Sequence, residues 1–99
     1  MPTHHAGQPV DPEALARTGM TADEFADTGI SHLRVLPTGE VAGLKRFLFT
    51  HAIIAGITPT GYSRRYCFQE YSEALGSLLQ WSGDGDPPGK YVNKSAGSK

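Results

Sequence analysis

Residues 61–89 read GYSRRYCFQEYSEALGSLLQWSGDGDPPG, and this stretch decides the fold. Residues 62–68 follow a Pro-Thr-Gly turn and are rich in aromatic side chains, which predicts a strand. Residues 70–81 carry apolar side chains at helical spacing with polar ones between them, which predicts an amphipathic helix. Residues 83–89 hold three glycines and two prolines and predict a stiff loop. Together these elements indicate an α+β domain.

The residues before this stretch predict the rest of a sheet. Residues 32–36 alternate apolar and polar side chains, and residues 37–39 (Pro-Thr-Gly) predict a turn, so a β-hairpin is expected there. Its second strand, residues 40–57, is long and apolar on both faces, which predicts the central strand. The same apolar positions also fit a helix, but the β-branched and aromatic residues favour the strand. The predicted cross-strand pairs are Ile57 with Tyr62, Ala55 with Arg64, Ile53 with Tyr66, and His51 with Phe68.

Two short helices are predicted near the N-terminus. Asp11 is followed by a proline, as at a capped helix start, and Gly19 can end that helix. Thr21 and Glu24 form a capping-box pattern for a second helix, which Gly29 can end. Helices of about two turns are unstable alone, so they must dock on an apolar surface. The predicted docking side chains are Leu15, Met20, Phe25 and Ile30.

The predicted fold class is therefore α+β. It comprises two short N-terminal helices, a three-stranded antiparallel sheet, and one C-terminal helix, with helices packed on one face of the sheet. A short final strand at residues 91–92 is an option. The 99 residues form a single small domain, of which residues 1–9 and 94–99 are expected to be flexible.

The composition of the chain bears on whether the protein is membrane-bound, secreted or cytoplasmic. The longest mostly apolar run, residues 47–57, is too short to span a bilayer, so no membrane partner is expected. No signal-peptide pattern opens the chain, and the single cysteine cannot form an intramolecular disulfide. A cytoplasmic location is expected.

Charge is distributed unevenly along the chain. Residues 1–30 hold five acids and one arginine, a net charge of −4, whereas residues 31–68 hold five cations and one acid, a net charge of +4. The two parts either face each other or are solvated separately, or one of them faces a charged partner.

No catalytic, metal or cofactor site is predicted. The histidines and Cys67 lack zinc-ligand spacing, and no acid or oxyanion donor can be assigned to Cys67 as a nucleophile. Asp84 and Asp86 flank a glycine as in calcium loops, but two prolines replace the remaining ligands. An enzyme is not expected.

Arg64 and Arg65 are the strongest candidates for recognition. Neighbours on a strand point to opposite faces, so one arginine should face the helices and pair with an acid such as Glu70 or Glu73. The other should be free on a surface with tyrosines, a composition typical of interface hot spots. A purely structural pair is the competing interpretation. The predicted partner-binding residues are Arg64, Arg65, Tyr62 and Tyr66, together with the acids Asp23, Glu24 and Asp27.

Nucleic-acid binding is the alternative function. Residues 45–49, KRFLF, resemble part of the RNA-recognition motif, in which aromatic side chains at i and i+2 on a strand stack on bases, and Tyr62, Arg64 and Tyr66 could extend that face. The motif's glycines are absent, and the isoelectric point of about 6.4 is low for a nucleic-acid-binding protein. Core packing of Phe47 and Phe49 is therefore favoured.

Trp81 ends the predicted C-terminal helix, at the edge of its apolar stripe. The loop 83–89 can turn back over its ring, so Trp81 is predicted to be buried and structural. The alternative is an exposed interface residue.

The segments HLRVLPTGEVAGLKRFLFT, GYSRRYC and WSGDGDPPG resemble a group of small proteins encoded by phages and mobile elements of Proteobacteria. The resemblance covers residues 30–92. It implies a non-enzymatic phage-type protein that binds and blocks a host macromolecular complex, as anti-CRISPR inhibitors do with a CRISPR surveillance complex. It assigns no role to any residue. A homodimer is left open, because a long strand with a modest helical cover would expose an apolar patch.

Overall fold

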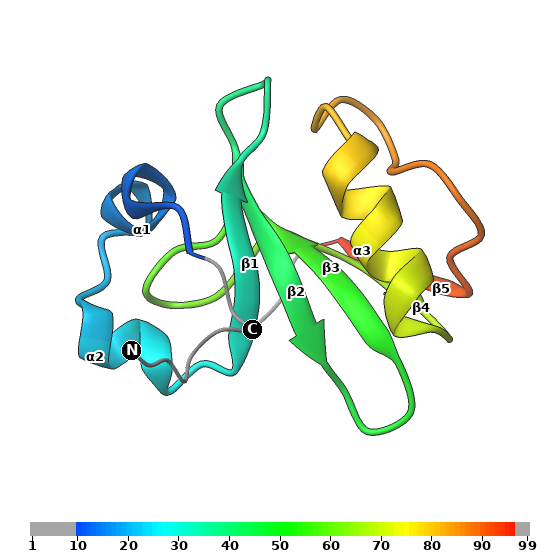
Figure 1. Ribbon diagram of the computed structural model, residues 1–99, viewed down its shortest axis with the longest axis horizontal. Helices are drawn as coiled ribbons and strands as arrows, with labels where there is room; N and C mark the ends of the chain where they lie inside the picture. The colour runs from blue at the N-terminus through cyan, green and yellow to red at the C-terminus, as the bar shows by residue number, and fades with distance from the viewer. Residues whose placement is uncertain (1–9, 97–99) are drawn as a thin grey trace, which may run out of the picture.

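The computed structural model describes residues 10–96, and for residues 93–96 it describes the backbone only. Within this range the chain forms three helices and five strands (Figure 1). They are α1 (Pro12–Thr18), α2 (Ala22–Ala26), β1 (Ile30–Val35), β2 (Val41–Arg46), β3 (His51–Ala55), β4 (Arg64–Phe68), α3 (Tyr71–Gln80) and β5 (Asn93–Ala96). The predicted α+β class with an antiparallel sheet is confirmed.

The sheet is an antiparallel meander in the order β1-β2-β3-β4-β5. The prediction of three strands was wrong, because residues 40–57 form two strands, β2 and β3, joined by a turn. In that turn the Phe47 amide donates to the Thr50 carbonyl at 2.8 Å. None of its residues is a glycine, proline or asparagine, so the sequence carried no turn signal. The final strand lies at Asn93–Ala96 rather than at residues 91–92.

The predicted register between β3 and β4 is confirmed. Ala55 pairs with Arg64, Ile53 with Tyr66, and His51 with Phe68. This register follows from the turn between the two strands, whose ends are joined by a bridge between Thr58 and Gly61. Cys67 lies opposite Ala52, on the face away from Phe68.

Helices cover both faces of the sheet, which corrects the expectation of one covered face (Figure 1). On one face α3 packs against β2, β3 and β4, and Leu44, Ile53 and Phe68 belong to that core. On the other face α1 packs against β1 and β2. The core on that side includes Met20, Phe25, Ile30, Leu33, Ile54 and Ile57, with Leu15 packed against it. β2 and β3 are apolar on both faces because each face has its own helical layer.

The caps of the two short helices follow the sequence prediction. The Asp11 side chain accepts a hydrogen bond from the Glu13 amide, and both halves of the Thr21–Glu24 capping box are formed. Gly19 ends α1 with a φ of 81°, a left-handed conformation that glycine adopts without steric cost. These caps fix helices of seven and five residues at their positions on the sheet.

β1 contains an irregularity between Ser31 and Arg34, where the register with β2 shifts. His32 lies there with a φ of 54°, which is unusual for a residue other than glycine. Its ring reaches the hydroxyl groups of Ser31, at 3.0 Å, and Tyr71, at 3.3 Å. The shift lets Leu33 enter the core beneath α1 while Arg34 turns towards α3, where it donates to the Leu78 carbonyl at 2.8 Å.

No helix in residues 10–96 is long and apolar enough to cross a membrane. The predicted flexible tail, residues 94–99, overlaps β5, which extends to Ala96. Residues 1–9 and 97–99 lie outside the described residues.

Candidate functional site

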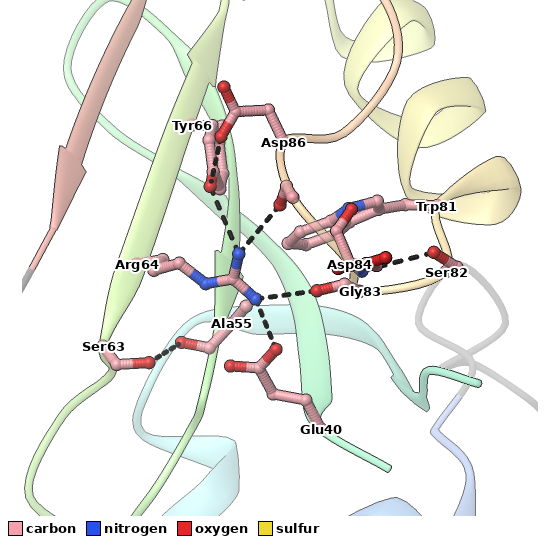
Figure 2. A network of polar contacts seen from close by, with 11 residues as sticks. Glu40, Ala55, Ser63, Arg64, Tyr66, Trp81, Ser82, Gly83, Asp84 and Asp86 are labelled. Atoms are coloured by element: carbon pink, nitrogen blue, oxygen red, sulfur yellow. Dashed lines mark hydrogen bonds and ion pairs between the residues drawn. The ribbon is translucent and has the colours of Figure 1, made fainter. Parts of the chain in front are cut away.

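Arg64 lies on the α3 side of the sheet and joins three segments of the chain (Figure 2). Its guanidinium donates to the Glu40 carboxylate and to the carbonyl oxygens of Gly83, at 3.1 Å, and Gly85, at 2.9 Å. It also lies over the Trp81 ring, 5.0 Å from the centroid. Burial alone would lower the pKa of Arg64, but the hydrogen bond and the charge of Glu40 outweigh it and raise this pKa. Arg64 is therefore a structural clamp.

Tyr66 belongs to the same network. Its hydroxyl donates to one Asp86 oxygen at 3.0 Å, and the hydroxyl of Tyr91 donates to the other at 2.8 Å. Burial, followed by the hydrogen bond to Asp86, raises the pKa of Tyr66 above its ordinary value of 10.0. Both oxygens of Asp86 thus accept from tyrosine hydroxyls, which is the arrangement of a loop anchor.

Trp81 is buried beneath this loop, as predicted, with 3% of its surface exposed. Its ring meets Tyr66 edge-on at 5.5 Å, and its indole N–H donates to the Asp84 carbonyl at 3.4 Å. The inward arginine of the pair is Arg64, but its carboxylate partner is Glu40 rather than Glu70 or Glu73. Glu40 was missed because it lies 24 residues away, at the end of the β1–β2 turn.

Arg65 lies on the opposite face, away from Tyr66, which belongs to the core beneath α3. Its guanidinium carbon is 5.1 Å from the centre of the Phe47 ring. Its Nε atom is buried and has no hydrogen-bond partner among the described residues. Arg65 therefore keeps a buried donor that no described residue satisfies.

Tyr62 is half-buried at the edge of the core beneath α1 and α2. It lines a hollow of about 280 Å³ together with Asp27. The structure thus brings Tyr62 to the acidic end of the molecule, and it brings Arg64 to Tyr66. It does not assemble the predicted residues into one site.

The acids Asp23, Glu24 and Asp27 are exposed on or directly after α2. Glu24 accepts from the Thr21 amide at 2.8 Å within the capping box. The two ion pairs found in residues 10–96 join other residues, Arg17 with Glu13 and Arg64 with Glu40. The three carboxylates are thus exposed to solvent and take part in neither of these ion pairs.

The cations of the strands are mostly engaged within the molecule. Arg34 and Lys45 donate to the carbonyl oxygens of Leu78 and Thr28, and Arg64 is clamped as described. Arg46 is exposed. The aromatic spacing expected for base stacking on a strand is absent, because Phe47 and Phe49 lie in the β2–β3 turn and not on a strand.

Within the described part of the chain, no group of three His, Cys, Asp or Glu side chains is placed to hold a metal ion. Cys67 is buried as a free thiol. The feature that sequence reasoning missed is the β2–β3 turn, where Leu48 and Phe49 are exposed. The run KRFLF carries no turn residue, so periodicity alone could not reveal the turn.

Comparisons with protein-family models, with curated proteins and with solved structures give no match to this chain.

Proposed function

We propose that this chain is a non-enzymatic, phage-type protein that binds a host macromolecular complex and blocks it in the host cytoplasm. The target we favour is a CRISPR surveillance complex, so the protein would act as an anti-CRISPR inhibitor. The resemblance of residues 30–92 to small phage and mobile-element proteins supports this setting.

The observation that carries the proposal is the acidic surface at α2. Asp23, Glu24 and Asp27 are exposed there, and neither of the ion pairs found in residues 10–96 includes them. A complex that holds RNA or DNA presents arginine and lysine side chains to phosphates. Three carboxylates on a capped helix can occupy such cations in place of the phosphates and exclude the nucleic acid.

Electrostatic blocking of this kind mainly affects association and specificity. It should weaken as salt rises, because exposed charges are screened over a Debye length of about 8 Å at physiological ionic strength. The fold holds the acidic surface in place through the caps of α1 and α2 and through Met20 and Phe25 in the core.

The test is the triple variant Asp23→Asn, Glu24→Gln, Asp27→Asn. Glutamine can replace glutamate in the capping box, so the helix should persist. The variant is expected to lose inhibition of a purified surveillance complex while keeping the wild-type melting temperature. Full inhibition by this variant would reject the acidic-surface mechanism.

A matched control separates the local surface from net charge. Glu70, Glu73 and Asp84 are also exposed acids, but they lie at α3 and the loop behind it. Neutralising these three changes the net charge by the same amount and should leave inhibition intact. Equal losses in both triple variants would indicate a general charge effect instead.

Nucleic-acid binding is less well supported, since Arg34, Lys45 and Arg64 are engaged by carbonyl or carboxylate groups of the protein. It stays a prediction. A gel-shift assay with single-stranded RNA and DNA at two salt concentrations tests it, because phosphate contacts weaken steeply with salt.

A further inference from the structure

A hollow of about 220 Å³ lies at one end of the sheet, where β1 begins, β2 ends, β3 begins and α3 starts (Figure 1). The polar side chains among its lining residues come from all four elements and include Ser31, Arg46, His51 and Tyr71. No aspartate or glutamate is among the described residues that line it. A hollow that is lined by cationic and hydroxyl groups without a carboxylate is complementary to an anion.

The two cationic groups of this hollow lie side by side. Arg46 and His51 are directly paired across β2 and β3, so their side chains point to the same face of the sheet. Arg46 is exposed, and the half-buried His51 ring meets the Tyr71 ring edge-on at 5.6 Å. Within residues 10–96, neither the guanidinium nor the imidazole makes a hydrogen bond or an ion pair. Lys45 also lines the hollow, but its ammonium donates to the Thr28 carbonyl.

The two hydroxyl groups are linked through the ring of His32. Its Nδ1 lies 3.0 Å from the Ser31 hydroxyl, and its Nε2 lies 3.3 Å from the Tyr71 hydroxyl. Burial lowers the pKa of His32, so its ring is neutral at pH 7 and has one donor and one acceptor nitrogen. One hydroxyl therefore donates to the ring and the other accepts from it. In either tautomer, the accepting hydroxyl keeps its own hydrogen for a further acceptor.

The backbone at His32 is strained to hold this arrangement. Its φ of 54° is unusual for a residue other than glycine. Strained backbone conformations cluster at binding and catalytic sites, where they fix groups in position. The strain here places one ring between the two hydroxyl groups that line the hollow, which supports a binding role.

We propose that this hollow binds a phosphate group, carried as a phosphomonoester by a small ligand. A phosphomonoester has three terminal oxygens and a charge of about −1.5 to −2 at pH 7. The Arg46 guanidinium can bind two of these oxygens as a fork. Protonated His51 and the remaining hydroxyl hydrogen supply further donors, and the two cations together match the charge. The hollow is smaller than the roughly 300–1,000 Å³ of pockets that enclose a whole ligand, so it accommodates the phosphate group alone.

Other anions fit this hollow less well. A carboxylate has two oxygens and one charge, so it would leave donors of the hollow unused. A phosphodiester of a nucleic-acid backbone also carries one charge per phosphate and matches only one of the two cations. The site does not involve the acidic surface at α2, so the proposal is independent of the proposed inhibition.

Titration of the full chain, labelled with ¹⁵N, by inorganic phosphate at constant ionic strength tests the proposal through amide chemical shifts. Shifts should concentrate at the ends of β2 and α3 that border the hollow. Arg46→Gln should weaken binding about tenfold, because it removes the charged fork. Lys90→Gln is the matched control: it removes an equal charge from an exposed position in the loop behind α3 and should bind as the wild type does. The same spectra show whether each variant is folded.

A second variant tests the imidazole. His51→Gln should bind phosphate more weakly than the wild type at about pH 6 and equally well at about pH 8, because histidine loses its proton over this range. Arginine and tyrosine do not change charge between these values, so Arg46 and Tyr71, which face the ring, do not contribute to the difference. The ligand has the same ionisation for both proteins at each pH, so the comparison isolates His51. An equal loss at both pH values would overturn its charge-pairing role.

A parallel titration with adenosine monophosphate distinguishes a free phosphate from a nucleotide. Equal affinities would mean that the phosphate group alone is recognised, and tighter binding of the nucleotide would identify a nucleotide as its carrier. The absence of localised shifts at about 10 mM phosphate would overturn the proposal. So would equal weakening by Arg46→Gln and Lys90→Gln, or acetate binding as tightly as phosphate. Tighter, Arg46-dependent binding of a single-stranded oligonucleotide without a terminal phosphate would assign the hollow to a nucleic-acid backbone instead.

Discussion

Trp81→Ala is expected to lower the free energy of unfolding by about 3–5 kcal/mol. The ring is almost fully buried, and it contacts Tyr66 edge-on and the Arg64 guanidinium face-on. Most of the loss should come from removed apolar contacts and the cavity left behind, because the indole hydrogen bond to Asp84 is long at 3.4 Å. In a domain of this length such a loss lowers the melting temperature by at least about 12 °C.

Urea denaturation followed by far-UV circular dichroism measures this cost, since Trp81 is the only tryptophan and its fluorescence is lost in the variant. Trp81→Phe is the control: it keeps an aromatic ring against Tyr66 and should cost only about 1–2 kcal/mol. If Trp81→Ala unfolds within about 0.5 kcal/mol of the wild type, the ring is not a core residue and the reasoning fails.

Tyr66 and two glycines provide further tests. The pKa of Tyr66 is raised in the folded state, so its contribution to stability is complete below the unfolded value of 10.0 and is lost as pH rises through the folded pKa. Denaturation between about pH 9 and about pH 11 should therefore show a smaller loss of stability for Tyr66→Phe than for the wild type, and equal slopes would contradict this. A Cβ on Gly83 would lie 2.2 Å from the Thr38 hydroxyl oxygen, at a φ of 100°, so Gly83→Ala should cost at least about 1 kcal/mol in urea melts. Gly76 lies in α3, and no atom is near its added Cβ, so Gly76→Ala should instead stabilise by about 0.5–1 kcal/mol. A stabilising Gly83→Ala would show that the loop geometry is misassigned, and a destabilising Gly76→Ala would show the same for the helix.

The sequence predicted correctly those features that depend on residues close together in the chain. The caps at Asp11 and Thr21, the register of Arg64 with Ala55, and the burial of Trp81 each depend on residues close together in sequence or joined by one short turn. Residues 40–57 fitted both a helix and a strand, and the strand was predicted. The structure confirms strand, but it divides the segment into two strands, β2 and β3. A turn built from Leu48 and Phe49 lacks the residues that normally mark a turn.

The candidate site was less predictable because it depends on distant segments. The alternation of side chains along a strand correctly predicted that Arg64 and Arg65 lie on opposite faces of the sheet. It could not predict that Glu40 is the partner of Arg64. Nor could it show that α1 and α2 pack on the face opposite α3, because an apolar strand indicates burial on both faces without saying which helix provides it. Asp23, which was predicted only as a partner-binding residue, is exposed on α2.

The clamp around Arg64 also has a kinetic consequence. It joins Glu40 to Gly83 and Gly85, and the adjacent Thr38 amide donates to the Ser82 carbonyl at 3.1 Å, so it closes chain loops of more than forty residues. Contacts across such separations form late, because the chain must first lose the entropy of closing the loop. Weakening the clamp should therefore accelerate unfolding and leave the folding rate nearly unchanged. Arg64 would then govern how long each molecule persists in its folded form more than how quickly it reaches that form.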